Sequence, residues 1–339
     1  MDIFSTDTLN EVVADLRVPA QGFAAKYFTN ISQDESEEIH FDVANGPRRM
    51  APFVSPLVAG KVVKSAGFKT NTFKPAYIKD KRVFSPNRAF KRSMGERIGG
   101  GEITPQQRMQ LLLVSDLQNQ LDMLECRLEW MATQALIYGA VTIVGDEYPA
   151  VVVDFGRSAA HTVAKTTGNK WTDTGINPMD DLQDWSDTMV KSCGVAMTDV
   201  IMGVDVWKVF RKHPHVEARL DRWRGSSTLV QNAHQKEGMV FQGIVDNFNV
   251  YTYSGWAIDP ITGLENQIMP AGTVVGCAGD QVEGMRCHGA INDHDSLAAL
   301  PYFSKSWLEQ DPSVRFLLMQ SAPLMVPFRP DATFRATVL

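Results

Sequence analysis

The sequence predicts an α+β protein, and three observations support this class. An apolar stripe with helical spacing runs through a segment from about residue 104 to 138. Short β-forming segments separated by turn residues gather before this helix and in the last third of the chain. Helices and strands do not alternate in repeating βαβ units, so a parallel α/β sheet is not expected.

Composition narrows the class further. The 339 residues are 44% apolar and 21% charged, which argues against disorder and leaves room for more than one domain. A net charge of −6 argues against a dedicated nucleic-acid binder, whose binding face would be basic. No apolar run is long enough to suggest a membrane span, and the opening residues "MDIFSTDTLNEVVADL" do not resemble a signal peptide. The cysteines are far apart and form no CxxC pair, so we expect reduced thiols at Cys126, Cys193, Cys277 and Cys287.

The first segment, roughly 1–47, is acid-rich. It holds nine acidic residues against two bases, Arg17 and Lys26. Two short helical patterns are expected, one on Leu9, Val12, Val13 and Leu16, the other after Pro19 on Phe23, Ala24, Tyr27 and Phe28. The charged run "SQDESEEIHFDV" then leads into a short strand.

The next segment, 48–103, reads as a basic two-stranded ribbon. From Lys61 to Arg92 there are ten Lys or Arg residues and one acid, Asp80. "FVSPLVAGKVVKSAGF" is expected to form one strand and "TNTFKPAYIKDKRVF" the returning one. Pro56 and Pro75 cannot donate ladder hydrogen bonds, which suits an edge or a free arm. An isolated two-stranded hairpin is marginal in water, so the ribbon needs a partner surface.

Three consecutive glycines, Gly99, Gly100 and Gly101, end the ribbon and predict a hinge. A Gly-rich loop before a helix can also cradle phosphate. This one lacks the Lys-Ser/Thr of a P-loop and the spacing of a dinucleotide fingerprint, which favours the hinge.

A long helix follows the hinge. Thr104 suits the N-cap, Pro105 the first turn, and Gln107 completes a capping box. The apolar stripe consists of Leu113, Leu117, Leu121, Leu124, Leu128, Met131 and Ala135, and Asp116, Asp122, Glu125 and Glu129 stay off it. The helix should end near Tyr138 and Gly139. Its single stripe predicts a spine laid along a sheet, and a homodimeric coiled coil is the alternative.

Beyond the spine, helices and strands are mixed. We expect a hairpin near 140–154, a helix capped by Asn177 with Pro178 at its first position, and a buried strand at "DVIMG". "VDVWKVFRKH" and "PHVEARLDRW" are expected to be helical turns. Two strands should meet around Asp246-Asn247, and a Pro-interrupted run of β segments ends the chain.

No local motif predicts catalysis. His213-Pro-His215 and the loose group of Cys287, His288, His294 and Asp295 match no standard zinc spacing. The sequence has no G-x-S-x-G, H-E-x-x-H or Walker A motif. We therefore expect no catalytic, cofactor or metal site. A hydrolase using His288, His294 and Asp295 is the enzymatic alternative, because triads are defined by geometry and not by chain order.

The order of these parts resembles the lambda-like phage capsid protein E family of major capsid proteins. The stretches that carry the resemblance are "FVSPLVAGKVVKSAGF", "FKPAYIKDK", "DFGRS", "RLDRWRGS", "DPITG…MPAGTVV" and "MQSAPLM". It implies the Hong Kong 97-type capsid fold: an N-terminal arm at 1–47, an extended loop at 48–103, a peripheral domain at 104–223 with return strands at 301–339, and an axial domain at 224–300.

The resemblance also implies a function without enzymatic activity. The chain would be a structural subunit that self-assembles into hexamers and pentamers of an icosahedral shell around double-stranded DNA. Its implied partners are a scaffolding protein, the portal and a decoration protein, with DNA touched only non-specifically and no membrane involved. It would reside in the virion, after assembly in the host cytoplasm. An encapsulin-like compartment shares this fold and is the alternative.

A contact between subunits explains a basic ribbon that lacks its own core. We expect the acids of the arm and the bases of the ribbon to pair across adjacent subunits, and contact with DNA is the alternative for these bases. Each exposed pair contributes only about 0–1 kcal/mol, but a closed shell repeats it many times. The expected interface residues are Asp34, Glu35, Glu37, Glu38, Lys69, Lys74, Lys79, Lys81 and Arg82. No motif identifies a crosslinking lysine.

Overall fold

The structure is a computed structural model. It describes residues 4–16, 22–36, 38–43, 50, 69–85, 87–90, 104–145, 148–173, 175–217, 220–221, 238–294, 296, 298–311 and 313–339. Several expectations therefore lie outside the described residues: the ascending half of the ribbon, Glu37, the hinge Gly99 to Gly101, and Asp295. Among the helices that are described, none is long and apolar enough to cross a membrane.

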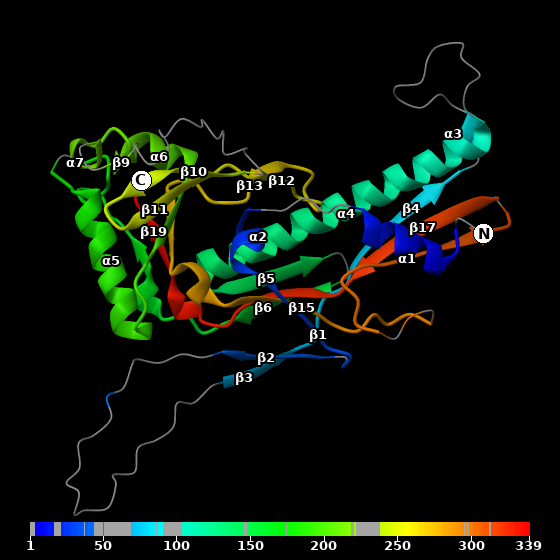
Figure 1. Ribbon diagram of the computed structural model, residues 1–339, viewed down its shortest axis with the longest axis horizontal. Coiled ribbons are helices and arrows are strands. Elements are labelled where there is room, and N and C mark those ends of the chain that lie inside the picture. The colour runs from blue at the N-terminus through cyan, green and yellow to red at the C-terminus, as the bar shows by residue number, and fades with distance from the viewer. Residues whose placement is uncertain are drawn as a thin grey trace, which may run out of the picture.

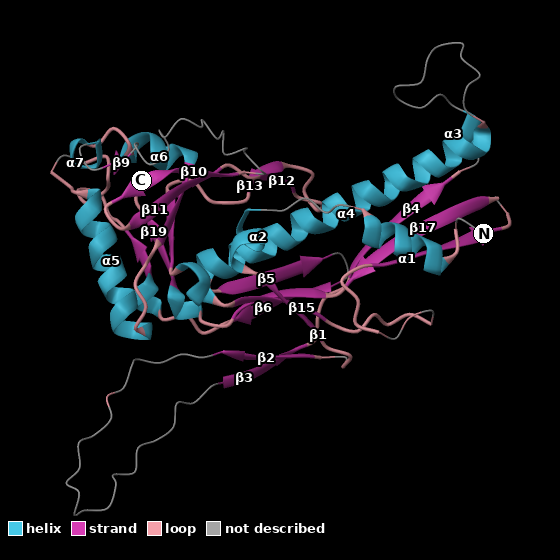
Figure 2. Cartoon of the chain, in the orientation of Figure 1, coloured by secondary structure: helices cyan, strands magenta, loops and turns pink. Residues whose placement is uncertain are grey.

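Helices and strands are both abundant (Figures 1 and 2). The helices are α1 (Thr6–Asp15), α2 (Gly22–Tyr27), α3 (Asn87–Phe90), α4 (Pro105–Tyr138), α5 (Pro178–Cys193), α6 (Val204–Phe210) and α7 (Pro214–Glu217). The strands before α5 are β1 (Asn30–Gln33), β2 (Ile39–Val43), β3 (Lys69–Phe73), β4 (Ile78–Phe84), β5 (Ala140–Gly145), β6 (Tyr148–Asp154) and β7 (Thr162–Ala164). Those after it are β8 (Asp199–Gly203), β9 (Leu220–Asp221), β10 (Met239–Val245), β11 (Phe248–Tyr253), β12 (Trp256–Ile258), β13 (Glu265–Gln267), β14 (Thr273–Cys277), β15 (Gly284–His288), β16 (Phe303–Glu309), β17 (Val314–Ser321), β18 (Pro323–Pro327) and β19 (Thr333–Thr337).

Helix α4 is the predicted spine. The Thr104 side chain accepts from the Gln107 backbone N–H and the Gln107 side chain accepts from the Thr104 backbone, which confirms the capping box. The helix ends at Tyr138, as expected, and Gly139 after it adopts the left-handed conformation (φ 66°) that commonly ends a helix. Every residue of the predicted stripe is buried. Figure 1 shows α4 crossing the molecule alongside β5 and β4.

The spine joins two hydrophobic cores. Its C-terminal half, from Leu128 to Ile137, packs into the larger core with α2, α5 and the central strands. Its N-terminal half, at Leu113, Leu117 and Leu121, packs into a smaller core with α1 and β17. A helix buried in this way needs no second copy to cover its stripe, so the coiled-coil alternative is wrong.

A seven-stranded mixed sheet dominates the larger core, in the order β7-β19-β14-β8-β11-β10-β9. The predicted strand β8 lies within it, and all five of its residues are buried. This sheet combines strands from both expected domains: β8 and β19 belong to the expected peripheral domain, and β14, which lies between them, belongs to the expected axial domain. The expected boundaries at 223/224 and 300/301 therefore do not separate two sheets. The division into arm, loop, peripheral and axial domains stays a proposal.

A second, three-stranded sheet, β16-β17-β4, lies beside the N-terminal half of α4. Helix α1 packs on it through Leu9 and Val13, which contact the smaller core. The third sheet, β1-β15-β18, brings a strand of the N-terminal segment into parallel pairing with β15. The acid-rich first segment thus carries one helix in each core, at α1 and α2.

Two local expectations differ from the structure. The returning half of the ribbon is not one strand: it divides at Pro75 into β3, which pairs with β2, and β4, which pairs with β17. Proline lacks the N–H that a continuous ladder needs, so the break falls there. The segment "PHVEARLDRW" was expected to be helical, but α7 ends at Glu217 and 220–221 form β9 against β10.

Candidate functional site

The histidines favoured by the enzymatic alternative lie in unlike environments. His288 is 2% exposed on β15, whereas His294 is exposed in a loop. Burial, together with nearby Arg286, lowers the pKa of His288 to about 4. His213 and His215 stack on each other with ring centroids 5.4 Å apart. No three potential metal ligands come together within the described part of the chain.

Sequence reasoning missed a contact between a serine and a buried histidine. Ser192 Oγ lies 2.7 Å from His161 Nε2, and His161 Nδ1 lies 3.0 Å from the Thr333 carbonyl oxygen. His161 is 0% exposed, so solvent and substrate do not reach the imidazole. The pair ties α5 to β19 and has the geometry of a structural contact. Nothing in the local sequence could have located it, because the two residues are 31 positions apart.

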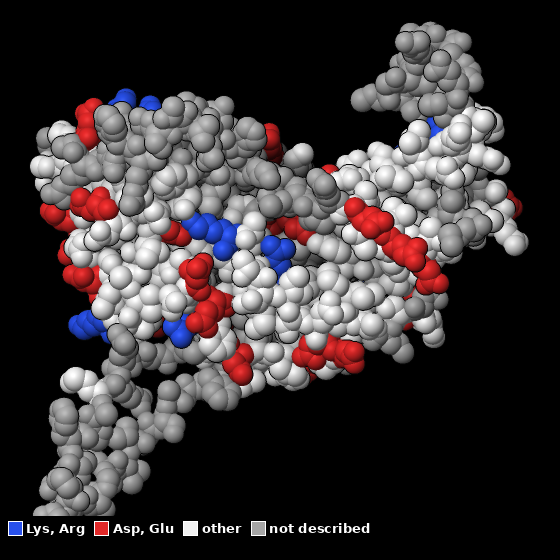
Figure 3. All heavy atoms as spheres, viewed as in Figure 1, with Lys and Arg blue, Asp and Glu red and all other residues white. Residues whose placement is uncertain are grey.

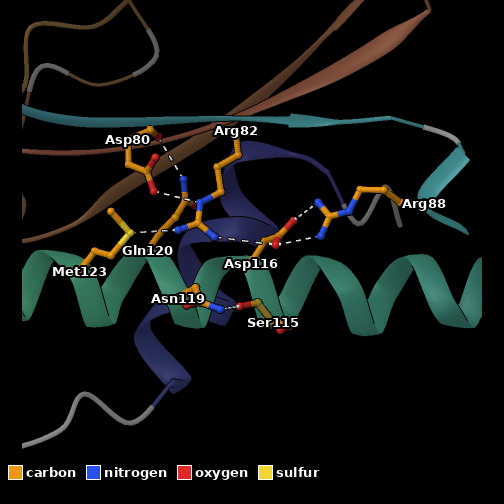
Figure 4. A network of polar contacts seen from close by, with 8 residues as sticks. All are labelled: Asp80, Arg82, Arg88, Ser115, Asp116, Asn119, Gln120 and Met123. Atoms are coloured by element: carbon orange, nitrogen blue, oxygen red, sulfur yellow. Dashed lines mark hydrogen bonds and ion pairs between the residues drawn. The ribbon is translucent and has the colours of Figure 1, made fainter. Parts of the chain in front are cut away.

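The root of the basic ribbon is fastened to the spine by ion pairs (Figure 4). Arg88 makes a bidentate contact with Asp116 of α4, at 2.5 and 3.1 Å. Arg82 Nε lies 3.0 Å from Asp80, and its Nη1 lies 3.8 Å from Asp116. Gln120 donates to the Asp80 carbonyl at 3.0 Å. The charge of Arg82, an expected interface residue, is therefore compensated inside its own chain.

The lysines of β4 point away from the spine. Residues in a strand alternate between faces, so Lys79 and Lys81 lie opposite Asp80 and Arg82. Both lysines are exposed. Lys81 Nζ lies 4.0 Å from the ring centroid of Phe316, and Lys79 Nζ lies 5.3 Å from that of Tyr77.

Asp34, Glu35, Glu38, Lys69 and Lys74 lie in or near the paired strands β2 and β3, and Glu37 lies outside the described residues. Asp34 accepts from the backbone N–H of Ser36 at 3.1 Å, and this bond lowers the pKa of its carboxyl. Glu35 and Glu38 are exposed. The pairing of Ile39 with Phe73 brings the end of the acidic run close to Lys74 within the same chain, and Lys69 lies at the far end of β3. The structure thus separates two groups of bases. Lys69 begins β3 and Lys74 directly follows it, whereas Lys79, Lys81 and Arg82 lie on β4.

A second feature that sequence reasoning missed is a clamp on α2. The carboxylate of Glu129 accepts from the backbone N–H groups of Phe23 and Ala24, both at 2.8 Å, and from the Tyr253 hydroxyl at 2.9 Å. Arg286 donates to the carbonyls of Phe28 and Ala24 at 2.7 and 3.0 Å. Negative charge at the helix start and positive charge at its end both complement the helix dipole.

Glu129 shows why the apolar periodicity of the helix did not predict this clamp. It lies off the apolar stripe as expected, yet it is 2% exposed, and Glu125 and Asp116 are also buried at 2% and 8%. Other segments pack beside the stripe and bury these acids: α2 and Tyr253 contact Glu129, and Tyr302 contacts Glu125. Arg82 and Arg88 contact Asp116. Burial raises the pKa of Glu129 despite its three hydrogen bonds.

Two of the stretches that carry the family resemblance have structural roles. Arg157, in "DFGRS", donates to the carbonyls of Leu136 and Ile137 at 2.8 and 2.7 Å and so caps the end of the spine. "MQSAPLM" joins β17 to β18, and all seven of its residues, 319–325, are buried.

Comparison with known proteins gives consistent matches. The family model described as phage major capsid protein E matches residues 5–338. The P21 prophage-derived major head protein of Escherichia coli O6:H1 is 30% identical over 321 residues, covering 91% of each chain. The major capsid protein of Escherichia phage lambda is 26% identical over 316 residues, again covering 91% of each.

Solved structures show the same fold. The crystal structure of a prophage capsid protein from E. coli CFT073 superposes with a TM-score of 0.77 at 20% identity, covering 99% of both chains. The capsid of Ralstonia phage GP4 superposes with a TM-score of 0.56 at 9% identity, covering 95% of this chain and 92% of that one. These likenesses confirm the predicted Hong Kong 97-type α+β fold.

Proposed function

The chain belongs to the phage major capsid protein E family, and we propose that it is the repeating subunit of an icosahedral phage head, assembling as hexamers and pentamers around double-stranded DNA. The observation that carries this proposal is the family match over residues 5–338. The fold agrees over 99% of the chain with a prophage capsid protein. The relatives that share sequence are major capsid or head proteins, so the encapsulin-like alternative has less support.

The subunit acts through contacts and not through a reaction. It is proposed to have no catalytic residue, cofactor or metal. The partners we propose are further copies of the chain, a scaffolding protein, the portal and a decoration protein, with DNA touched non-specifically. Assembly takes place in the host cytoplasm, and the finished subunit belongs to the virion.

Contacts between subunits are proposed to involve opposite charges. In this proposal the exposed carboxylates Glu35 and Glu38 of one copy, with Asp34 and Glu37, face lysines of the β3–β4 segment of its neighbour. The exposure of Glu35, Glu38, Lys79 and Lys81 supports this. Arg82 is a weaker member of the set, because its guanidinium contacts Asp80 and Asp116 of its own chain. Charge of this kind sets register and salt sensitivity more than total stability.

The test of the shell function is direct. The full chain is expressed alone and with a scaffolding protein, then followed by sedimentation velocity and negative-stain microscopy. We expect closed shells, or capsomers that convert to shells when scaffold is supplied. A chain that stays monomeric or dimeric at every salt and protein concentration, with scaffold present, would contradict the proposal.

The charge contact has its own test. Asp34, Glu35, Glu37 and Glu38 are reversed together to Lys, and assembly is measured across a salt series. We expect weaker assembly with an altered salt dependence. Unchanged assembly at low salt would remove these acids from the interface.

A further inference from the structure

The sheet β16-β17-β4 has two unlike faces. One is covered by α1 and α4 and contains Leu317 and Met319, which are 1% and 3% exposed. The other contains Lys81 and Val83 on β4 and Phe316 on β17, where Phe316 pairs directly with Val83. Val83 is 53% exposed. A sheet with one solvated face is ordinary, but its outward positions are then usually polar.

The outward face combines positive charge with aromatic rings. Lys81 Nζ lies 4.0 Å from the ring centroid of Phe316 and 5.3 Å from that of Trp307, which pairs with Phe316 from β16. Trp307 is 37% exposed. Within the described residues, neither Lys79 nor Lys81 has an ion pair with a carboxylate. We call Lys79, Lys81, Val83, Trp307 and Phe316 the basic face.

Helix α1 presents the opposite charge. Its outward side contains Asp7, Glu11 and Asp15, one acid every four residues, while Leu9 and Val13 are buried. The helix contains no Lys or Arg. Like charges four residues apart on a helix repel each other, so the row costs stability unless a cation lies against it. Figure 3 shows acidic side chains in a continuous row where α1 runs.

The acid row and the basic face of one copy cannot meet. Helix α1 packs on the covered side of the sheet, through Leu9 and Val13, whereas Lys79 and Lys81 project from the other side. Their spacings nevertheless match. Acids four residues apart on a helix are separated by about 6 Å along its axis, and alternate residues of a strand by about 7 Å.

We infer that the basic face of one copy is the docking surface for helix α1 of a second copy of this chain. The inference rests on the proposed shell function and deepens it. Of the lysines of the β3–β4 segment, Lys79 and Lys81 are assigned to Glu11 and Asp15 of the neighbour, and Lys69 and Lys74 are left for the acids at 34–38. Val83 and Trp307, which are exposed, and the half-buried Phe316 provide apolar contact around the charge pairs. The two surfaces are on opposite sides of one sheet. Each copy therefore binds one neighbour through its basic face and a second neighbour through helix α1. Such a head-to-tail contact closes into a ring when the rotation between neighbouring copies closes, as the proposed hexamers and pentamers require.

A charge exchange tests this contact in the full chain. One variant carries Glu11→Lys and Asp15→Lys, a second carries Lys79→Glu and Lys81→Glu, and a third carries all four changes. Each two-site variant should raise the protein concentration for half-maximal assembly at least about tenfold at low salt, and the four-site variant should return it near the wild-type value. The control carries Lys191→Glu and Lys208→Glu at exposed positions of α5 and α6. It changes the net charge by the same amount as the Lys79→Glu, Lys81→Glu variant and should assemble normally. Normal assembly of either two-site variant, or no recovery in the four-site variant, would overturn the docking.

Disulfide trapping keeps the inference testable if a charge variant folds poorly. Assembled shells of the chain with Glu11→Cys and Lys81→Cys are treated with oxidised glutathione, and a ladder of linked chains is expected on a non-reducing gel. The chain with Lys208→Cys and Lys81→Cys, in which Lys208 is exposed on α6, should give no ladder. If the wild type forms shells but the Glu11→Cys, Lys81→Cys chain stays unlinked, the docking is overturned and the proposed function stands. If the wild-type chain forms no shell, the proposed function and the docking are both overturned. Normal shells of the Lys79→Glu, Lys81→Glu variant that retain less DNA would instead assign the basic face to phosphate groups.

Discussion

The buried His288 makes the stability of the subunit depend on pH. Its side chain is 2% exposed, and within the described residues its Nδ1 has no hydrogen-bond partner. Burial first, and the positive charge of Arg286 second, lower its pKa from 6.5 to about 4. The native state therefore keeps this imidazole neutral in a pH range where the unfolded chain protonates it.

The magnitude follows from the two pKa values. Between pH 6.5 and about 4 the unfolded chain takes up a proton that the native subunit does not, so the unfolding free energy falls as pH falls. The loss attributable to His288 is about 2 kcal/mol at pH 5 and approaches about 3 kcal/mol near pH 4, below which it stays constant.

The assay is urea unfolding of the unassembled subunit at pH 7.5, 6 and 5, followed by tryptophan fluorescence. His288→Leu removes the titrating group and keeps a buried side chain of similar size, so its unfolding free energy should fall less between pH 7.5 and 5, by about 2 kcal/mol. Other groups titrate in the same range, which is why the difference between the two proteins is the quantity measured. His294→Ala, at an exposed position, should follow the wild type.

Two results would refute this reasoning. Equal pH dependence of the wild type and His288→Leu would mean that His288 is hydrated or protonated in the native subunit. A pH dependence that is lost in His294→Ala and kept in His288→Leu would assign the proton uptake to the exposed histidine.

Three further predictions concern the spine helix. Arg157→Lys should destabilise the subunit by about 1–3 kcal/mol in urea unfolding, because one ammonium cannot reproduce the fork on the Leu136 and Ile137 carbonyls, and equal stability would contradict the capping role. Gly139→Ala should cost more than Gly168→Ala in thermal unfolding: both glycines have positive φ, but a Cβ at 139 would lie 2.7 Å from Arg157 Cβ, whereas one at 168 meets nothing within 4 Å. Leu117→Ala, at 0% exposure, should cost about 2–5 kcal/mol, and Leu111→Ala, at 56%, less than about 1 kcal/mol; similar costs at both sites would contradict the position of the smaller core.

The local sequence was sufficient where structure depends on local geometry. The capping box at Thr104, the helix end near Tyr138 and Gly139, and the N-cap Asn177 were all predicted, because these preferences arise within a few residues of backbone. The buried strand β8 was predicted from its apolar run. The break at Pro75 was missed although proline marks it, because the competing partners β2 and β17 are far away in the sequence.

The candidate interface was predicted only in part. Charge counting identified an acidic first segment and a basic ribbon, but it could not tell which bases stay available. Arg82 and Lys81 are adjacent in sequence, yet one contacts Asp116 of the spine and the other projects from the opposite face. Neighbouring residues of a strand point to opposite faces, and α4 packs on only one face of the sheet that contains β4, so Arg82 contacts the spine and Lys81 does not.

Short-range sequence patterns were enough to predict the class, the family and the spine. Apolar periodicity, caps and glycines act over short distances, and the family motifs extend over nearly the whole chain. Three features were visible only in the folded chain. Glu129 is buried and clamps α2, α1 and the β4 lysines lie on opposite sides of one sheet, and one mixed sheet contains strands from both sides of the expected domain boundaries. These features depend on which distant segments pack together. The free energy of that packing is a sum over contacts throughout the core, so it cannot be inferred from any short stretch of sequence.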